Sequence, residues 1–286
     1  MTSLEKNALY EALSTAGRRP DISLLKNIVD SSKIYKRPLL DLFGRVLSEN
    51  LSSLDSSDPM RQVGIITGRL LIQMKAVEAI PLIGELYRTT WSDDVTVDGL
   101  DRDPAAFGTV SIPVFSSIAK MNTLNKWHNG KAVSITILTD IALVNNEARS
   151  EIQHVLRDLL PPLTSRGGIS APKDEMWGDI AVALGKLRDE ASYKTIIAMM
   201  RQGIIDSSKL SRNRYEKFYL GKQKPRQPEP FDIFKKYESV GNFEDMMNSM
   251  LNAPETQGPD SSQDFVSKAR QIESKKNRKK KGKGRP

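Results

Sequence analysis

Two histidines are the first residues to consider for chemistry, because imidazole is a common catalytic base and metal ligand. They are His128, in KWHNG, and His154, in IQHVL. No HExxH pattern or nearby carboxylate cluster accompanies either one, so they make a poor metal site. His128 is expected to end a helix before the turn pair Asn129–Gly130, and His154 to lie beside the apolar stripe of its helix. Capping, packing or surface exposure therefore explains both histidines better than catalysis.

Other residue types that carry enzyme chemistry are missing from the sequence or are wrongly spaced. The chain has no cysteine, which excludes thiolate zinc sites, a cysteine nucleophile and disulfides. The stretch 164–168 lacks the GxxxxGK[ST] pattern of a phosphate-binding loop, and no GxSxG nucleophile turn occurs. One acidic loop does not match the DxDxDG spacing of a calcium site and is better explained as solvated. Its carboxylates are Asp93, Asp94, Asp98, Asp101 and Asp103.

We therefore predict no catalytic, cofactor-binding or metal-binding residue, and a protein that is not an enzyme. An enzyme whose polar groups converge from several helices stays open as a third hypothesis, because such convergence happens only in space.

The net charge of +8 is concentrated at the C-terminal end of the chain. Eight basic residues, with no acidic residue among them, lie within 275–286: Lys275, Lys276, Arg278, Lys279, Lys280, Lys281, Lys283 and Arg285. Without these eight, 35 of the 43 basic residues remain, against 35 acidic ones. This run is expected to be disordered. It is a candidate site for RNA, DNA, the ribosome or another polyanion, for an acidic protein or for an anionic membrane; a solubilising end is the alternative.

Amphipathic helical segments are the elements that would position any functional group. The stretches 61–75 and 76–90 each carry one apolar stripe, and the connection between them is short enough to predict an antiparallel hairpin. Pro81 is tolerated if the second helix begins near Val77, because the first four amides of a helix have no intrahelical partner. Earlier helices are expected over 3–16, 21–29 and 38–50, with Asp21 as a cap of the second and Asp58 as a cap of the helix at 61–75.

Two further pairs are predicted, 131–144 with 147–163 and 176–187 with 193–204. The first member, KAVSITILTDIALV, is rich in β-branched residues but keeps helical spacing, so a helix is favoured over a strand. The anchor positions Ile83, Leu156 and Ile197 lie 73 and 41 residues apart, which fits two units and one unit of a repeat of about 40–47 residues. Asp103–Pro104 is expected to start another helix, bent or broken at Pro113. This broken segment, 104–128, would be the degenerate missing unit.

The character of the sequence changes after Leu220. We expect a helical-repeat domain over 1–220, and a proline-rich linker with a largely disordered basic tail over 221–286. Within the latter, 242–252 could form a short helix, and it is left open whether 231–251 docks on the body. Three aromatic residues are weak candidates for contact with a partner: Trp177, Phe231 and Phe234.

The hairpins, together with Trp177–Ala181 (WGDIA) and Gly203–Asp206 (GIID), resemble a family of largely uncharacterised bacterial proteins built of HEAT-like helical repeats. The resemblance covers roughly 60–220 and rests on no diagnostic residue. It implies an α–α superhelix and supplies no catalytic residues. Some family members carry a C-terminal SEC-C zinc motif, which this cysteine-free chain cannot have.

The expected fold class is therefore all-α: an α–α superhelix, or HEAT-like helical-repeat solenoid, with a disordered basic C-terminal tail. The expected function is a non-enzymatic scaffold or adaptor that binds a protein or peptide. The alternative is a nucleic-acid- or ribosome-associated protein that uses its tail. No apolar run approaches the roughly 20 residues that span a bilayer, and the N-terminus lacks the pattern of a signal peptide, so we expect a cytoplasmic protein.

Overall fold

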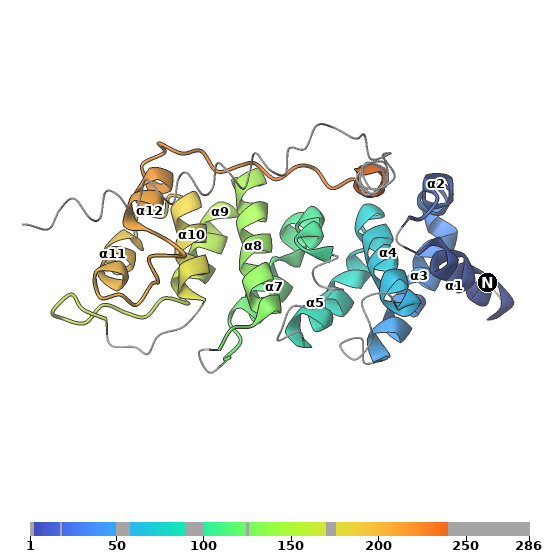
Figure 1. The fold of residues 1–286 in the computed structure, drawn as a ribbon, viewed down its shortest axis with the longest axis horizontal. Coiled ribbons are helices and arrows are strands. Elements are labelled where there is room, and N and C mark those ends of the chain that lie inside the picture. The colour runs from blue at the N-terminus through green and yellow to red at the C-terminus, as the bar shows by residue number, and fades with distance from the viewer. Residues whose placement is uncertain are drawn as a thin grey trace, which may run out of the picture. The chain divides into compact units, whose positions relative to one another are not determined.

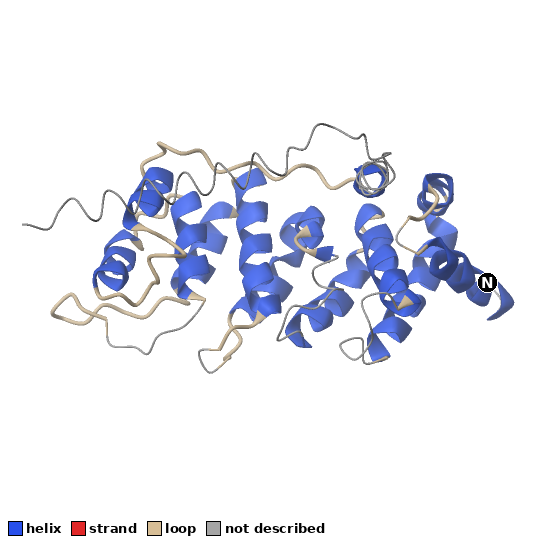
Figure 2. Ribbon diagram, in the orientation of Figure 1, coloured by secondary structure: helices blue, strands red, loops and turns tan. Residues whose placement is uncertain are grey.

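The structure of the chain is a computed structural model that describes residues 3–17, 19–49, 58–89, 100–123, 126–169 and 176–239. The chain divides into two compact units, Met1–Glu238 and Ser239–Pro286. Nearly all of the second unit lies outside the described residues, and so does the short helix expected at 242–252. Helices make up the secondary structure of the described part, which contains no strand and one isolated bridge between Leu163 and Ile169 (Figures 1 and 2). The fold of this part is all-α.

The N-terminal elements are α1 (Ser3–Ala16), α2 (Ile22–Asp30), α3 (Ser32–Ser48), α4 (Pro59–Gln73), the 3₁₀ turn η2 (Val77–Ala79) and α5 (Ile80–Thr89). The later elements are η3 (Asp103–Ser111), α7 (Ile112–Ala119), α8 (Asn129–Val144), α9 (Arg149–Arg157), α10 (Trp177–Lys186), α11 (Tyr193–Arg201) and α12 (Arg212–Tyr219). A last helical stretch occupies 233–239.

Side-chain caps set the starts of several helices, as their sequences predict. The Asp21 carboxylate accepts a hydrogen bond from Ser23 N at 2.8 Å, and Asp58 accepts one from Met60 N at 2.8 Å. Such caps satisfy backbone amides that have no partner within the helix. The predicted start of the third helix at Pro38 was wrong. Helix α3 already begins at Ser32 and accommodates Pro38 in its interior, with the proline ring buried in the core.

The turn after α4 explains the position of Pro81. Lys75 adopts a left-handed conformation, with φ of 53°, and Ala76 N donates to Leu71 O at 3.0 Å. This arrangement is a Schellman cap formed without glycine. A 3₁₀ turn follows, and Pro81 lies in the first turn of α5, as predicted. Arg188, with φ of 54°, makes the same cap after α10.

The packing of the helices differs from the predicted hairpins. Helix α4 packs chiefly on α3 and α1, whereas α5 packs chiefly on α8 and α7. Helix α10 likewise packs on α8, α12 and α9 rather than chiefly on α11; only the pair α8 and α9 packs across its short turn as expected. The most extensive contacts are those of α3 with α4 and of α7 with α8, whose members lie further apart in the sequence. A left-handed residue in a short turn changes the direction of the chain. Two helices joined by such a turn therefore need not pack on each other.

Two predicted helices were drawn with the wrong limits. The break in the segment after Asp103 lies at Gly108, whose φ of 72° and ψ of −146° are not helical, while Pro113 lies in the first turn of α7. Helix α9 ends at Arg157 rather than at Leu163. The Pro161–Pro162 pair that follows is incompatible with continued helix, because proline has no amide hydrogen to donate.

Helix α8 is held at its N-terminal end by a close backbone contact with α5. A Cβ atom added to Gly130 would lie 1.7 Å from Tyr87 O. His128 is the N-cap of α8: its Nδ1 accepts from Lys131 N at 3.1 Å, and its Nε2 lies 3.2 Å from Arg88 O. His128 therefore begins a helix and does not end one, and Asn129–Gly130 is its first turn. The capping role was predicted, but at the opposite end of a helix.

One continuous core of buried apolar side chains runs through the first unit, from Leu9 to Tyr237. Ile233 is fully buried in it, although it comes 13 residues after the domain boundary expected at Leu220. The compact unit extends to Glu238. The residues 221–238 thus belong to the same unit as the helices before them.

We predict that Gly130→Ala lowers the free energy of unfolding by about 1–3 kcal/mol, because the new methyl group must displace the Tyr87 carbonyl. Urea unfolding followed by circular dichroism measures the change. Gly44→Ala is the matched control. Gly44 lies in α3 with open space around it, so alanine there should stabilise by about 0.5–1 kcal/mol. Equal stability of Gly130→Ala and the wild type would show that the contact is not close in solution.

A pH dependence follows from the buried cap of α8. Burial lowers the pKa of His128 below its ordinary value of 6.5, so the unfolded chain takes up the proton first. Stability is therefore full above about pH 6.5 and falls as the pH drops towards the lower pKa of the folded state. His128→Asn keeps a capping oxygen and cannot titrate in this range, so its unfolding free energy should change less between pH 7 and pH 5. His154→Gln, which removes the exposed histidine, is the control variant.

Candidate functional site

The site residues predicted from sequence fall into three groups in the structure. The eight basic residues of the tail, from Lys275 to Arg285, lie outside the described residues. Trp177 begins α10 and is only 7% exposed, so its side chain is part of the core. Phe231 and Phe234 are half-buried and pack against the core of their own unit. Phe231 and Phe234 therefore make a contact at the surface of the body, and this contact is within the chain itself.

Residues 221–238 form a segment, hereafter the return segment, that leaves the end of α12 and reaches α4. In Figure 1 it is the orange stretch that runs from α12 across the view to a short helix near α4. Its start is held by Gln223 N, which donates to Lys217 O at 2.8 Å. Gly221, with φ of 70°, lies against the Arg188 guanidinium: a Cβ atom added there would lie 2.8 Å from one of its nitrogens. The segment is thus attached to the body at both ends.

Proline keeps the middle of the return segment extended. Lys224, Gln227 and Glu229 each precede a proline, and a residue before proline is excluded from the helical region by steric contact. Pro225 and Pro228 are half-buried, while Lys224 and Arg226 are exposed. Pro225 and Pro228 therefore face the body, and the two cations face solvent.

The short helix at 233–239 begins with a side-chain cap and docks through apolar residues. Asp232 accepts hydrogen bonds from Phe234 N at 2.9 Å and from Lys235 N at 3.2 Å. Ile233 N donates to the Gln73 side chain of α4 at 3.1 Å, and the Ile233 side chain is fully buried. Lys26 of α2 lies 5.8 Å from the centre of the Phe234 ring. The helix thus contacts both α2 and α4.

A buried carboxylate holds the other side of this helix. Asp103, at the start of η3, pairs with Arg69 of α4 at 3.2 Å and with Lys236 of the return segment. Burial raises the pKa of Asp103, and the two cations oppose that effect. Arg69 also lies 5.1 Å from the centre of the Tyr237 ring, and burial raises the pKa of the Tyr237 phenol. Three separate parts of the chain therefore meet at one charged cluster.

A second buried carboxylate, Asp140, lies near the C-terminal end of α8. It pairs with Arg102 at 3.4 Å, and burial raises its pKa against the effect of Arg102 and Lys186. Lys186 of α10 is partly buried, and burial lowers its pKa, with Arg102 and Arg214 acting in the same direction. Arg102 and Lys186 thus lie near the buried Asp140, and Arg214 lies near Lys186.

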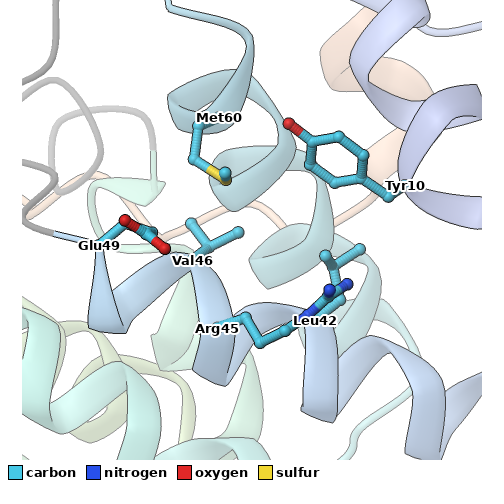
Figure 3. Close-up of a pocket in the computed structure, with 6 residues that line it drawn as sticks. All are labelled: Tyr10, Leu42, Arg45, Val46, Glu49 and Met60. Carbon is cyan, nitrogen blue, oxygen red and sulfur yellow. The ribbon is translucent and has the colours of Figure 1, made fainter. Parts of the chain in front are cut away.

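A pocket between α1, α3 and α4 has a volume of about 280 Å³. Figure 3 shows Tyr10 from α1, Met60 from α4, and four residues from α3 and its C-cap, Leu42, Arg45, Val46 and Glu49. Its volume lies just under the usual range of small-molecule sites, about 300–1,000 Å³. We assign it no ligand.

The residues singled out for catalysis or metal binding are not brought together. His128 is a buried helix cap, and His154 is exposed beside Asp158, 3.7 Å away. Within the described ranges, no group of three or more potential metal ligands occurs. Asp93, Asp94 and Asp98 lie outside those ranges. The helices that the structure describes include none that is both long and apolar enough to cross a bilayer.

Sequence reasoning missed the buried Asp140 and the docking residues of the return segment, Ile233 and Tyr237. Asp140 is a lone carboxylate in the apolar run ITILTDIALV, which is a signal for a buried, paired charge. In FDIFKKY, Ile233 and Tyr237 have the i, i+4 spacing of one helix face, which was available as a sign of helix. Nothing in the sequence indicated that this face would meet Asp103.

Comparison of the chain with family models, with curated proteins and with solved structures gave no match.

We predict that Lys236→Met loosens the return segment, because Asp103 then keeps only Arg69 as a cationic partner. A lost hydrogen bond to a charged group corresponds to about 1–3 kcal/mol in the free energy of local opening. Amide hydrogen exchange of residues 233–238 should become about 5- to 150-fold faster. Lys235→Met, one position earlier and exposed, is the control and should exchange like the wild type. Equal protection in all three proteins would contradict a holding role for the Lys236–Asp103 pair.

Proposed function

We propose that this protein is a non-enzymatic scaffold or adaptor whose helical body binds a peptide segment of a protein partner. In this proposal the body is a HEAT-like α–α superhelix, and the binding face is the one that now holds the return segment. That face comprises α2, α4 and the start of η3. Binding there requires no catalytic group, only an apolar docking surface with fixed charges.

The observation that carries the proposal is the chain's own occupant of this face. An amphipathic helix that lays its apolar side on a groove is a common mode of peptide recognition. Here Ile233 and Tyr237 supply the apolar side and Lys236 supplies a cation for the buried Asp103. A partner segment should therefore carry two apolar residues four apart, the second preceded by a lysine or arginine.

The covalent connection sets the conditions for such a partner. A short linker keeps a bound segment at an effective concentration of about millimolar. A partner peptide must outcompete the attached return segment, or bind after that segment has dissociated from the face. Binding by a partner in trans is thus expected to be weak in the wild-type chain and stronger once the return segment is released.

This expectation can be tested with a synthetic peptide of residues 221–239 and the full-length protein. Ile233→Asp combined with Tyr237→Ser should release the return segment, because a charge and a polar group replace its two buried anchors. Fluorescence anisotropy should then show saturable binding of the labelled peptide to the variant and at least tenfold weaker binding to the wild type. A peptide with the same two substitutions should not bind.

Circular dichroism and thermal unfolding of the variant establish that its helices persist. Absence of peptide binding to a folded, released variant would refute the proposed face. Equal binding to the wild type and the variant would also refute it, because the return segment would then occupy some other surface.

The alternative function is binding of a polyanion such as RNA or the ribosome through the basic tail. It is favoured by the position of eight cations within 275–286 and by the neutral balance of the remaining chain. Removal of those charges should then abolish binding to nucleic acid.

A further inference from the structure

The neutral balance of residues 1–274 conceals a strongly basic stretch within the first unit. Between Lys186 and Arg226 the chain has eleven basic and four acidic residues, a net charge of +7. This stretch includes the end of α10, all of α11 and α12, and the start of the return segment. When charges are summed over residues 1–274, acidic residues elsewhere offset this positive excess.

The cations nearest the end of α12 lie on its surface. Arg212, Arg214 and Lys217 are exposed on the helix, and Lys222, Lys224 and Arg226 are exposed on the return segment that follows. We call these six residues the α12 patch. The carboxylates that pair with them are Glu216, 2.8 Å from Arg212, and Glu229, beside Arg226. Six cations against two carboxylates leave this surface with a positive charge.

Like charges also gather at the edge of the patch, next to α10. Lys186 is partly buried, and Arg102 and Arg214 both lie close enough to disfavour its charged form. Asp140 is the one carboxylate that favours it. Cations held this close to one another repel, and a bound anion would relieve that repulsion.

The spacing of the exposed cations suits a chain of phosphates. In an extended backbone, alternate residues lie about 7 Å apart, which resembles the separation of successive phosphates in an extended single strand. Lys224 and Arg226 occupy alternate positions of such a backbone, and Lys222 lies in the bend that leads into it. Tyr193 and Tyr219 stack beside the patch with ring centres 4.6 Å apart, and both are half-buried. Aromatic rings beside cations are typical of surfaces that bind single-stranded nucleic acid.

We propose that the α12 patch binds the phosphate backbone of single-stranded RNA, independently of the basic tail. The contacts are electrostatic, so binding releases counterions and weakens steeply with salt. The site does not read sequence. It lies on the body, so nucleic acid is held at α12 whether or not the tail is present.

The experiment uses the full-length chain with its eight tail cations changed to glutamine. In this background the patch variant carries Arg214→Gln, Lys217→Gln and Lys224→Gln. The control carries Lys33→Gln, Lys126→Gln and Arg166→Gln, which remove three exposed cations elsewhere and give the same net charge. Anisotropy of a fluorescein-labelled 20-nucleotide oligouridylate is measured between 50 and 200 mM salt.

The proposal requires the tail-neutralised protein to bind the oligonucleotide with a steep dependence on salt. The patch variant should lose about 2 from the slope of log affinity against log salt, as about 0.7 for each of three phosphate contacts predicts. The control variant should keep the slope. Loss of all binding on neutralising the tail alone would assign binding to the tail and overturn the proposal. Equal slopes for the patch and control variants would overturn it as well.

A second arm distinguishes RNA from an acidic protein. Polyglutamate with the same number of charges should compete for the patch only weakly, because the patch matches the spacing of backbone phosphates. Equal competition would refute the assignment to nucleic acid. None of the three patch substitutions alters the face at α2, α4 and η3, so the peptide experiment should be unaffected.

Discussion

A carboxylate that is removed from water needs cationic or hydrogen-bonding partners, and Asp103 obtains them from two distant parts of the chain. Arg69 precedes it by 34 residues and Lys236 follows it by 133. Burial alone would favour the neutral acid, and both cations oppose that effect. This requirement connects the fold of the helical body to the position of the return segment. The return segment covers the surface of the body and also supplies Lys236 as a partner for the buried Asp103.

The first compact unit extends beyond α12 because the return segment reaches Asp103 and the core beside it. Proline keeps the residues after α12 extended, and an extended chain of about a dozen residues can reach well beyond the next helix. Ile233 and Tyr237 then join the apolar core that the preceding helices form. A sequence composition typical of a linker thus produces an ordered connection, because its far end has a specific partner.

Sequence patterns predicted what depends on neighbours along the chain. The caps at Asp21 and Asp58, the first-turn position of Pro81 and the helical state of 131–144 follow from local chemistry, and the structure confirms them. Contacts between distant residues were not predictable in this way. The partners of α4 and α5 depend on the direction in which Lys75 turns the chain, and the pairing of Asp103 with Lys236 depends on the whole path of the return segment.

The two proposed binding surfaces share one covalent element. The α12 patch includes the first half of the return segment, and the peptide-binding face is occupied by its second half. RNA that holds Lys222, Lys224 and Arg226 restrains the segment, whereas a peptide that takes the place of Ile233 and Tyr237 releases it. Thermodynamic linkage then requires each ligand to change the affinity of the other by the same factor. Since a restrained segment competes more effectively for its own groove, the sign of this coupling is negative: bound RNA weakens peptide binding, and a bound peptide weakens RNA binding.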